Sequence, residues 1–145
     1  LDKFMGDGIM ALWGAPVRHP DDATRSVDCA LEQKEVLASF NAERAAAGRP
    51  ELKFGIGIHT GPVVAGYIGS SKALSYTVIG DTANTSARLC GVATPGQILV
   101  SEYTLQQLHG RYRFEELPPA QLKGKEKPFR IFSILGREAS VQIPR

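Results

Sequence analysis

The sequence contains no long hydrophobic run, few cysteines and no strong excess of charge. No apolar stretch approaches the roughly 20 residues that a membrane-spanning helix needs, so we expect no membrane contact by this domain. Cys29 and Cys90 lack C-x-x-C spacing, which predicts reduced core thiols rather than a disulfide or a metal cluster. The formal net charge is +2, and no basic stripe carries interleaved aromatics, so nucleic-acid binding is not expected. Together these features predict a cytoplasmic protein.

The length of 145 residues suits one domain with a sizeable buried core. Leu1 stands inside an apolar stretch with no methionine before it, so we expect this chain to be part of a larger, multidomain protein. We predict a single domain over residues 1–137 and a C-terminal tail at residues 138–145.

Hydrophobic periodicity predicts a mixture of helices and strands. Apolar residues at three- and four-residue spacing predict a long helix from residue 23 to about residue 48. Two shorter helices are expected, over residues 82–90 with Asp81 as N-cap, and over residues 102–108 with Ser101 as N-cap. Strands are expected at residues 52–59, 63–68 (running back along 52–59), 74–79, 97–100, 112–117 and 129–135. This order predicts an α+β domain with helices on one face of a mostly antiparallel sheet.

The first informative stretch covers residues 1–14, where two short apolar segments flank Gly6, Asp7 and Gly8. This pattern predicts a hairpin whose turn holds the Asp7 carboxylate at its tip, four residues after Lys3. A hard divalent cation takes such a carboxylate together with phosphate oxygens. A surface hairpin with a turn aspartate explains the same pattern.

The second informative stretch places Asn84 and Arg88 four residues apart near the start of a predicted helix. Both side chains then project from one face, and an amide beside a guanidinium at a helix N-terminus suits a developing phosphate charge. An exposed polar stripe is the alternative. A third stretch, the lysine-rich residues 122–128, is explained equally by a solvated basic hairpin.

These three stretches, in this order, resemble the catalytic domain of class III adenylate and guanylate cyclases. Residues 3–14 are similar to the K-x-x-G-D-x-x-M-A-x-[FW]-G hairpin of that family, and residues 76–88 to its [DT]-x-x-G-x-x-x-N-x-x-x-R element. Residues 122–125 resemble its K-G-K loop, so the resemblance spans residue 1 to about residue 135. It implies a ferredoxin-like α+β fold that works as a head-to-tail homodimer, with active sites in the interface.

The resemblance also implies site residues and a cofactor. The implied roles are metal binding by Asp7, purine recognition by Lys3 and Thr77, ribose orientation by Asn84, stabilisation of α-phosphate charge by Arg88, and binding of the terminal phosphates by Lys123. The implied cofactor is a pair of Mg²⁺ or Mn²⁺ ions in each site. The family's other metal-binding aspartate lies on a strand before the hairpin, in a segment that this sequence does not contain. A molecule that began at Leu1 would therefore be expected to turn over little substrate.

The pair Lys3 and Thr77 predicts the nucleotide. A lysine donates to adenine N1 and a threonine hydroxyl accepts from the 6-amino group, whereas guanine would present a protonated N1 to the lysine. Guanylate members of the family carry Glu and Cys at these positions, so we expect ATP to be converted to 3′,5′-cyclic AMP and pyrophosphate. The threonine variant resembles a bacterial subgroup associated with bicarbonate stimulation.

Two alternatives to an active cyclase stay open from the sequence. One is a catalytically inactive cyclase-homology module that binds nucleotide or a partner and regulates an attached domain. The other is a protein-interaction domain of the same fold.

Overall fold

The computed structural model describes residues 3–5, 7–70, 73–110, 112–123, 125 and 127–138, and for strand residues 3–5, 68–70 and 73–78 it describes the backbone alone. Most of the predicted tail, residues 139–145, lies outside this described part. The core is a four-stranded sheet in which β3 and β6 are parallel and the other two pairings are antiparallel. Its strands, in spatial order, are β3 (Ile56–Ile58), β6 (Ile98–Ser101), β8 (Phe129–Arg137) and β7 (Tyr112–Ala120). The predicted α+β class with a mostly antiparallel sheet is confirmed.

The helices of the described part lie close to their predicted positions. They are α1 (Asp22–Ala46), α2 (Asp81–Val92) and α3 (Glu102–Gln106). Ser101 caps α3 as expected, since its side chain accepts a hydrogen bond from the Thr104 amide at 3.4 Å. The predicted cap at Asp81 is wrong. Gly80, with φ of 131°, precedes α2 instead, and the Asp81 carboxylate is engaged by Lys125 from a distant loop.

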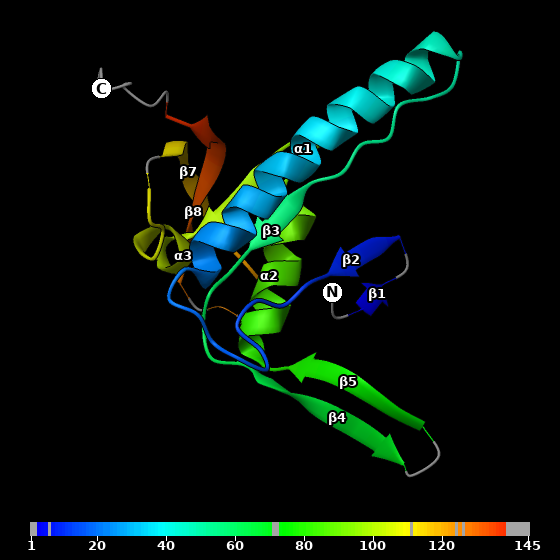
Figure 1. Ribbon diagram of the computed structural model, residues 1–145. Helices are drawn as coiled ribbons and strands as arrows, with labels where there is room; N and C mark the ends of the chain where they lie inside the picture. Colours follow the sequence, from blue (N-terminus) through cyan, green and yellow to red (C-terminus); the bar gives the residue numbers. More distant parts are fainter. Residues whose placement is uncertain are drawn as a thin grey trace, which may run out of the picture.

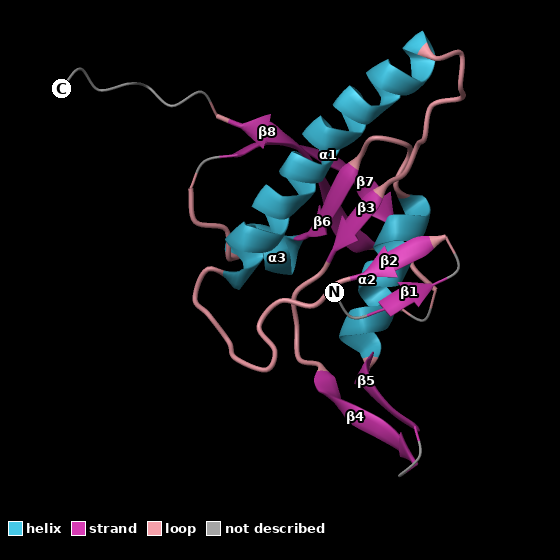
Figure 2. Cartoon of the chain, turned by 45° about the vertical axis from the view of Figure 1, so that its right-hand side comes forward, coloured by secondary structure: helices cyan, strands magenta, loops and turns pink. Residues whose placement is uncertain are grey.

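The two long helices cover opposite faces of the sheet (Figures 1 and 2). On one face, Val27 of α1 packs in a cluster with Ile98 and Val100 of β6. On the other face, Leu89 of α2 packs with Leu99 of the same strand. Alternate residues of a strand point to opposite faces, and all four residues of β6 are buried. The expectation that the helices share one face is therefore wrong, because the central strand is covered on both of its faces.

Two ribbons stand outside the four-stranded sheet. The first is the predicted hairpin, in which β1 (Lys3–Met5) pairs with β2 (Gly8–Met10). The second joins β4 (Val64–Ser70) to β5 (Ala73–Ile79) and projects away from the core below α2 in Figure 1.

The expected pairing of residues 63–68 with residues 52–59 is wrong, because β4 pairs with β5. Hydrogen bonds at the turn explain the change of direction. Thr82 Oγ1 donates to the carbonyl oxygen of Pro62 at 2.6 Å, and the Thr60 hydroxyl lies 2.8 Å from that of Thr104. These contacts tie the turn to the start of α2 and to α3, which directs β4 away from β3.

Candidate active site

Asn84 and Arg88 lie on the outer side of α2. Ala83 and Thr85, on either side of Asn84, are buried toward the sheet, so the Asn84 side chain is directed to solvent. Arg88 follows one turn later and is partly buried. Asn84, the fourth residue of α2, lies near the positive end of the helix dipole, where a phosphate group is favoured, and Arg88 adds a cation one turn further along.

Gly57 of β3 determines how deeply α2 sits on the sheet. A Cβ atom at this position would lie 2.3 Å from the Cys90 nitrogen and 2.7 Å from the Ser86 carbonyl oxygen. Real Cβ atoms essentially never approach another heavy atom this closely, within 3.0 Å. The absent side chain therefore allows direct contact between the strand and the backbone of the helix that carries Asn84 and Arg88.

A loop that carries Leu122, Lys123 and Lys125, called here the 121–125 loop, is attached to the same helix; residue 124 of this loop lies outside the described part. Leu122 is 2 % exposed and packs in the cluster of Leu89. The Lys125 amide donates to the Leu122 carbonyl at 3.1 Å, and Gln121 Nε2 donates to the Lys125 carbonyl at 2.7 Å. Lys123 lies in this turn with its side chain exposed. The fold therefore brings the turn that carries Lys123 to the helix that carries Asn84 and Arg88.

The electrostatics of this region centre on Asp81. Its hydrogen bond from Lys125 holds the pKa of the carboxyl below its usual value, and the charges of Lys125, Arg88 and His59 act in the same direction. His59 lies beside this group and contacts the Ser101 hydroxyl through Nδ1 at 2.7 Å. Burial lowers the pKa of His59, and the charge of Lys125 adds to that effect while Asp81 opposes it.

Sequence reasoning missed these contacts. In the sequence Asp81 has the character of a helix cap, and Lys125 belongs to a run of lysines. Because 44 residues separate them, no local pattern indicates that they pair. His59 carried no motif signal.

The remaining predicted site residues lie on other elements. Asp7 is exposed in the turn between β1 and β2. Lys3 is opposite Met10 in β1, and Thr77 is opposite Gly66 in β5, but both of these side chains lie outside the described part. β5 ends at Ile79, with Gly80 between it and α2, whereas Lys3 and Asp7 belong to the separate hairpin.

The residues present fit a metal that is held mainly by the substrate. The described part of the chain contains no cluster of three or more His, Cys, Asp or Glu side chains that could hold an ion. Mg²⁺ is commonly bound by one or two carboxylates together with substrate phosphates and water. Asp7 offers one exposed carboxylate of this kind.

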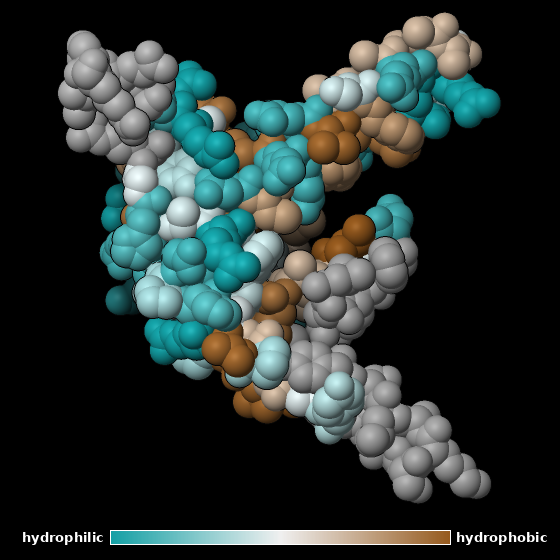
Figure 3. Space-filling view, in the orientation of Figure 1, coloured by the Kyte–Doolittle hydropathy of each residue, from teal (hydrophilic) through white to brown (hydrophobic). Residues whose placement is uncertain are grey.

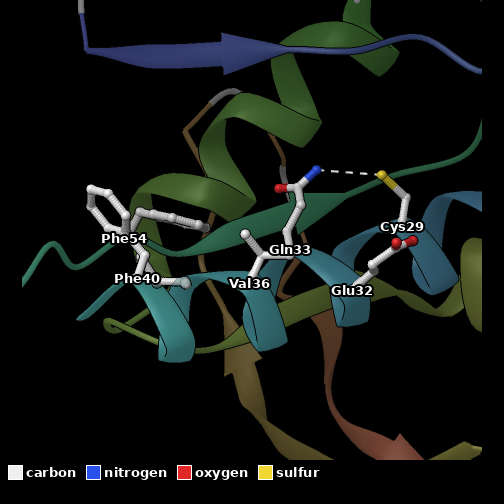
Figure 4. A pocket seen from close by; sticks show the side chains of 7 residues that line it. Cys29, Glu32, Gln33, Val36, Phe40 and Phe54 are labelled. Atoms are coloured by element: carbon white, nitrogen blue, oxygen red, sulfur yellow. Dashed lines mark hydrogen bonds between the residues drawn. The ribbon is translucent and has the colours of Figure 1, made fainter. Parts of the chain in front are cut away.

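An apolar groove of about 410 Å³ lies along α1. In Figure 3 apolar side chains gather on the flank of α1, and Figure 4 shows Val36, Gln33 and Cys29 pointing from this helix into the hollow. Its lining residues are Cys29, Glu32, Gln33, Val36, Leu37, Phe40 and Phe54. This set contains no cation, so the groove is unsuited to a nucleoside triphosphate.

Comparison with known proteins identifies the family context of this site. The family model described as "Adenylate and Guanylate cyclase catalytic domain" matches residues 3–136. "Adenylate cyclase 1" of Rhizobium meliloti is 35 % identical over 136 residues, which cover 92 % of this chain and 20 % of that protein. The chain thus spans about a fifth of the length of this relative. Among its described residues, no helix has the length and apolar character required to cross a bilayer.

Two solved structures share the fold. The guanylyl cyclase Cya2 superposes with a TM-score of 0.83 and is 37 % identical, with 98 % of this chain and 72 % of that one covered. The adenylyl cyclase CyaB from P. aeruginosa superposes with a TM-score of 0.86 over 99 % of this chain and 74 % of that one. At 24 % identity the second likeness concerns the fold alone.

Proposed function

Because this chain belongs to the adenylate and guanylate cyclase catalytic-domain family, we propose that it converts ATP to 3′,5′-cyclic AMP and pyrophosphate. The observation that carries the proposal is the convergence of Asn84, Arg88 and the anchored Lys123 loop on α2. Cyclisation of a nucleoside triphosphate needs precise positioning and donors aimed at the phosphates, and little covalent chemistry from the protein.

The proposed reaction is an in-line displacement at the α-phosphorus. The ribose 3′-oxygen forms the new P–O bond and its proton passes to water. The bond from the α-phosphorus to the bridging oxygen breaks, and its electron pair leaves on pyrophosphate. Asn84 orients the ribose so that the hydroxyl faces the phosphorus. Arg88 donates to the α-phosphate oxygens as charge develops on them, and Lys123 binds the terminal phosphates.

The proposed metal site centres on Asp7. Two bound Mg²⁺ or Mn²⁺ ions would favour deprotonation of the attacking hydroxyl and neutralise charge on the departing oxygens. Asp7 supplies a carboxylate at the tip of a tight turn, where it can reach outward. In the proposed head-to-tail homodimer, the Asp7 turn of one copy faces α2 of the other, whereas Lys3 serves the site built on α2 of its own copy.

Arg88→Ala tests the chemistry in the intact protein with ATP and Mn²⁺. Loss of one preorganised donor to the developing charge is expected to lower kcat by about 100- to 1000-fold, measured as cyclic AMP formed. Arg113→Ala is the matched control, because Arg113 is exposed on the edge strand β7. Equal activity of the two variants would contradict the assignment. An inactive wild-type protein that still bound ATP would favour the regulatory cyclase-homology module.

The dimer proposal is tested by complementation. Lys3→Ala and Asp7→Ala should each abolish activity, since in the head-to-tail arrangement these residues serve different sites of one dimer. Mixing the two inactive proteins under subunit exchange should restore roughly a quarter of wild-type activity, because half of the dimers would then contain one intact site of two. No recovery despite proven exchange would contradict the interfacial arrangement.

GTP is the second candidate substrate, because Cya2, a guanylyl cyclase, is 37 % identical to this chain. The Lys3 and Thr77 pair supports ATP, since guanine N1 would leave an unpaired donor facing the lysine. Comparing kcat/KM for the two nucleotides decides between them. Combining Lys3→Glu with Thr77→Cys is expected to shift the preference toward GTP, and an unchanged ratio would contradict purine recognition by this pair.

A further inference from the structure

The ion pair between Asp81 and Lys125 joins two elements that the proposed chemistry needs together. Asp81 is the first residue of α2, and Lys125 closes the loop that carries Lys123. Of the ion pairs in the described part that involve a lysine or an arginine, this is the one that ties a loop to α2. It lies at the end of the helix where Asn84 projects.

A second anchor holds the same loop further along the helix. Leu122 is buried in the cluster of Leu89, eight residues after Asp81 and therefore about 12 Å along the helix axis. The loop is consequently attached to α2 at two separated points, one apolar and one ionic. Lys123, between these anchors in the sequence, is exposed.

The surroundings of Lys125 restrict its position. Its ammonium group lies 5.9 Å from the centre of the Phe129 ring, which also lies 5.5 Å from the His59 ring and 6.2 Å from the Tyr103 ring. The Lys125 amide and carbonyl are both hydrogen-bonded within the loop. The Asp81 carboxylate interacts electrostatically with both Lys125 and Arg88. It therefore lies between the loop and the predicted catalytic arginine in charge terms, attracting both cations.

We propose that the Asp81–Lys125 ion pair is a positioning contact, which holds the 121–125 loop on α2 so that Lys123 and the Asn84–Arg88 pair address the same triphosphate. This inference rests on the proposed cyclase function and extends it to two residues that bind no substrate themselves. Asp81 holds Lys125 in place, and Lys125 in turn fixes the position of the loop that carries Lys123.

The kinetic test compares Asp81→Asn, Lys125→Gln and the double variant in the intact protein. An exposed ion pair of this kind supports an effect of about fivefold, expected as a rise in KM for the nucleotide with a smaller change in kcat. The double variant should be no worse than either single variant, because both remove one contact. Asp81→Glu, which keeps the charge, should recover most of the affinity.

Glu116→Gln is the matched control, because it breaks the exposed Arg130–Glu116 pair of 2.8 Å on β7 and β8. Its KM should equal that of the wild type. A lower KM in Asp81→Asn would show that the carboxylate blocks the phosphate site, and would overturn the proposal. Additive losses would overturn it too, since they would indicate that Lys125 binds substrate directly.

Amide hydrogen exchange provides a readout that does not depend on activity. Asp81→Asn should speed exchange at the Lys125 amide about fivefold, whereas Glu116→Gln should leave it unchanged. Unaltered exchange in Asp81→Asn would overturn the positioning role. An inactive wild-type protein would refute the proposed function instead, while the exchange measurement would still decide whether the ion pair holds the loop.

Discussion

Replacing Gly57 by alanine should displace α2 and reduce activity more than stability. The added Cβ would lie 2.3 Å from the Cys90 nitrogen, 2.7 Å from the Ser86 carbonyl oxygen and 2.8 Å from the Leu89 carbonyl carbon. All three are backbone atoms, so no side-chain rotation relieves the overlap. Restoring an ordinary contact of 3.4 Å requires the helix to move by about 1 Å.

The magnitude follows from that displacement. Overpacking of a close-packed interface typically costs about 1–3 kcal/mol of unfolding free energy. A shift of about 1 Å at groups that position a substrate lowers the rate by about 100-fold. Asn84 and Arg88 move with the helix, so kcat should fall on this scale while the protein stays folded.

The assay is cyclic AMP formation together with thermal unfolding in the intact protein. Gly91→Ala is the matched control, because Gly91 lies on the same helix and, outside the adjoining backbone of that helix, nothing lies within 4 Å of its would-be Cβ. That change should raise stability by about 0.5–1 kcal/mol through helix propensity and leave activity unchanged. Equal melting temperature and activity in Gly57→Ala and wild type would refute the close-packing argument.

Three further predictions concern stability. Tyr112→Phe removes a hydrogen bond of 2.6 Å from the Tyr112 hydroxyl to Asp28 and should cost about 1 kcal/mol in urea unfolding, whereas Tyr103→Phe, at a half-exposed ring, should cost almost nothing. Burial raises the pKa of Tyr112 to about 12, so the contribution of its hydroxyl to the free energy of unfolding is complete below pH 10 and is lost as pH rises through 12. A difference in unfolding free energy between Tyr112→Phe and wild type that stayed constant across that range would contradict this. Burial lowers the pKa of His59 from 6.5, so on acidification the unfolded chain binds this proton before the folded protein does. The free energy of unfolding should therefore fall as pH drops below 6.5. His59→Gln should flatten this decline in a pH series of melting temperatures, and an unchanged slope would contradict the assignment.

Local patterns in the sequence were sufficient for most elements. The spacing of apolar residues predicted α1 to within a few residues, since a helix buries one stripe whatever it packs against. The helix expected over residues 82–90 matches α2 to a similar degree, although its predicted cap was wrong. Turn chemistry predicted the β1–β2 hairpin around Asp7, and the placement of Asn84 and Arg88 on one helix face followed from their spacing. Their functional roles stay predictions.

Long-range pairing was beyond such patterns. The apolar run of β6 is compatible with a strand covered on one face or on two, and only packing of Val27 and Leu89 from opposite sides decided between them. The β4 strand paired with β5 because side-chain hydrogen bonds redirected the preceding turn.

The sequence by itself determined the family motifs, the helices and the hairpin, because each depends on residues a few positions apart. Only the tertiary structure decided that the Asp81 carboxylate pairs with Lys125 instead of capping its own helix. It also decided that α2 packs directly against the backbone of Gly57. Both depend on which distant segments meet, and that choice is made by the packing of the whole core rather than by any local preference.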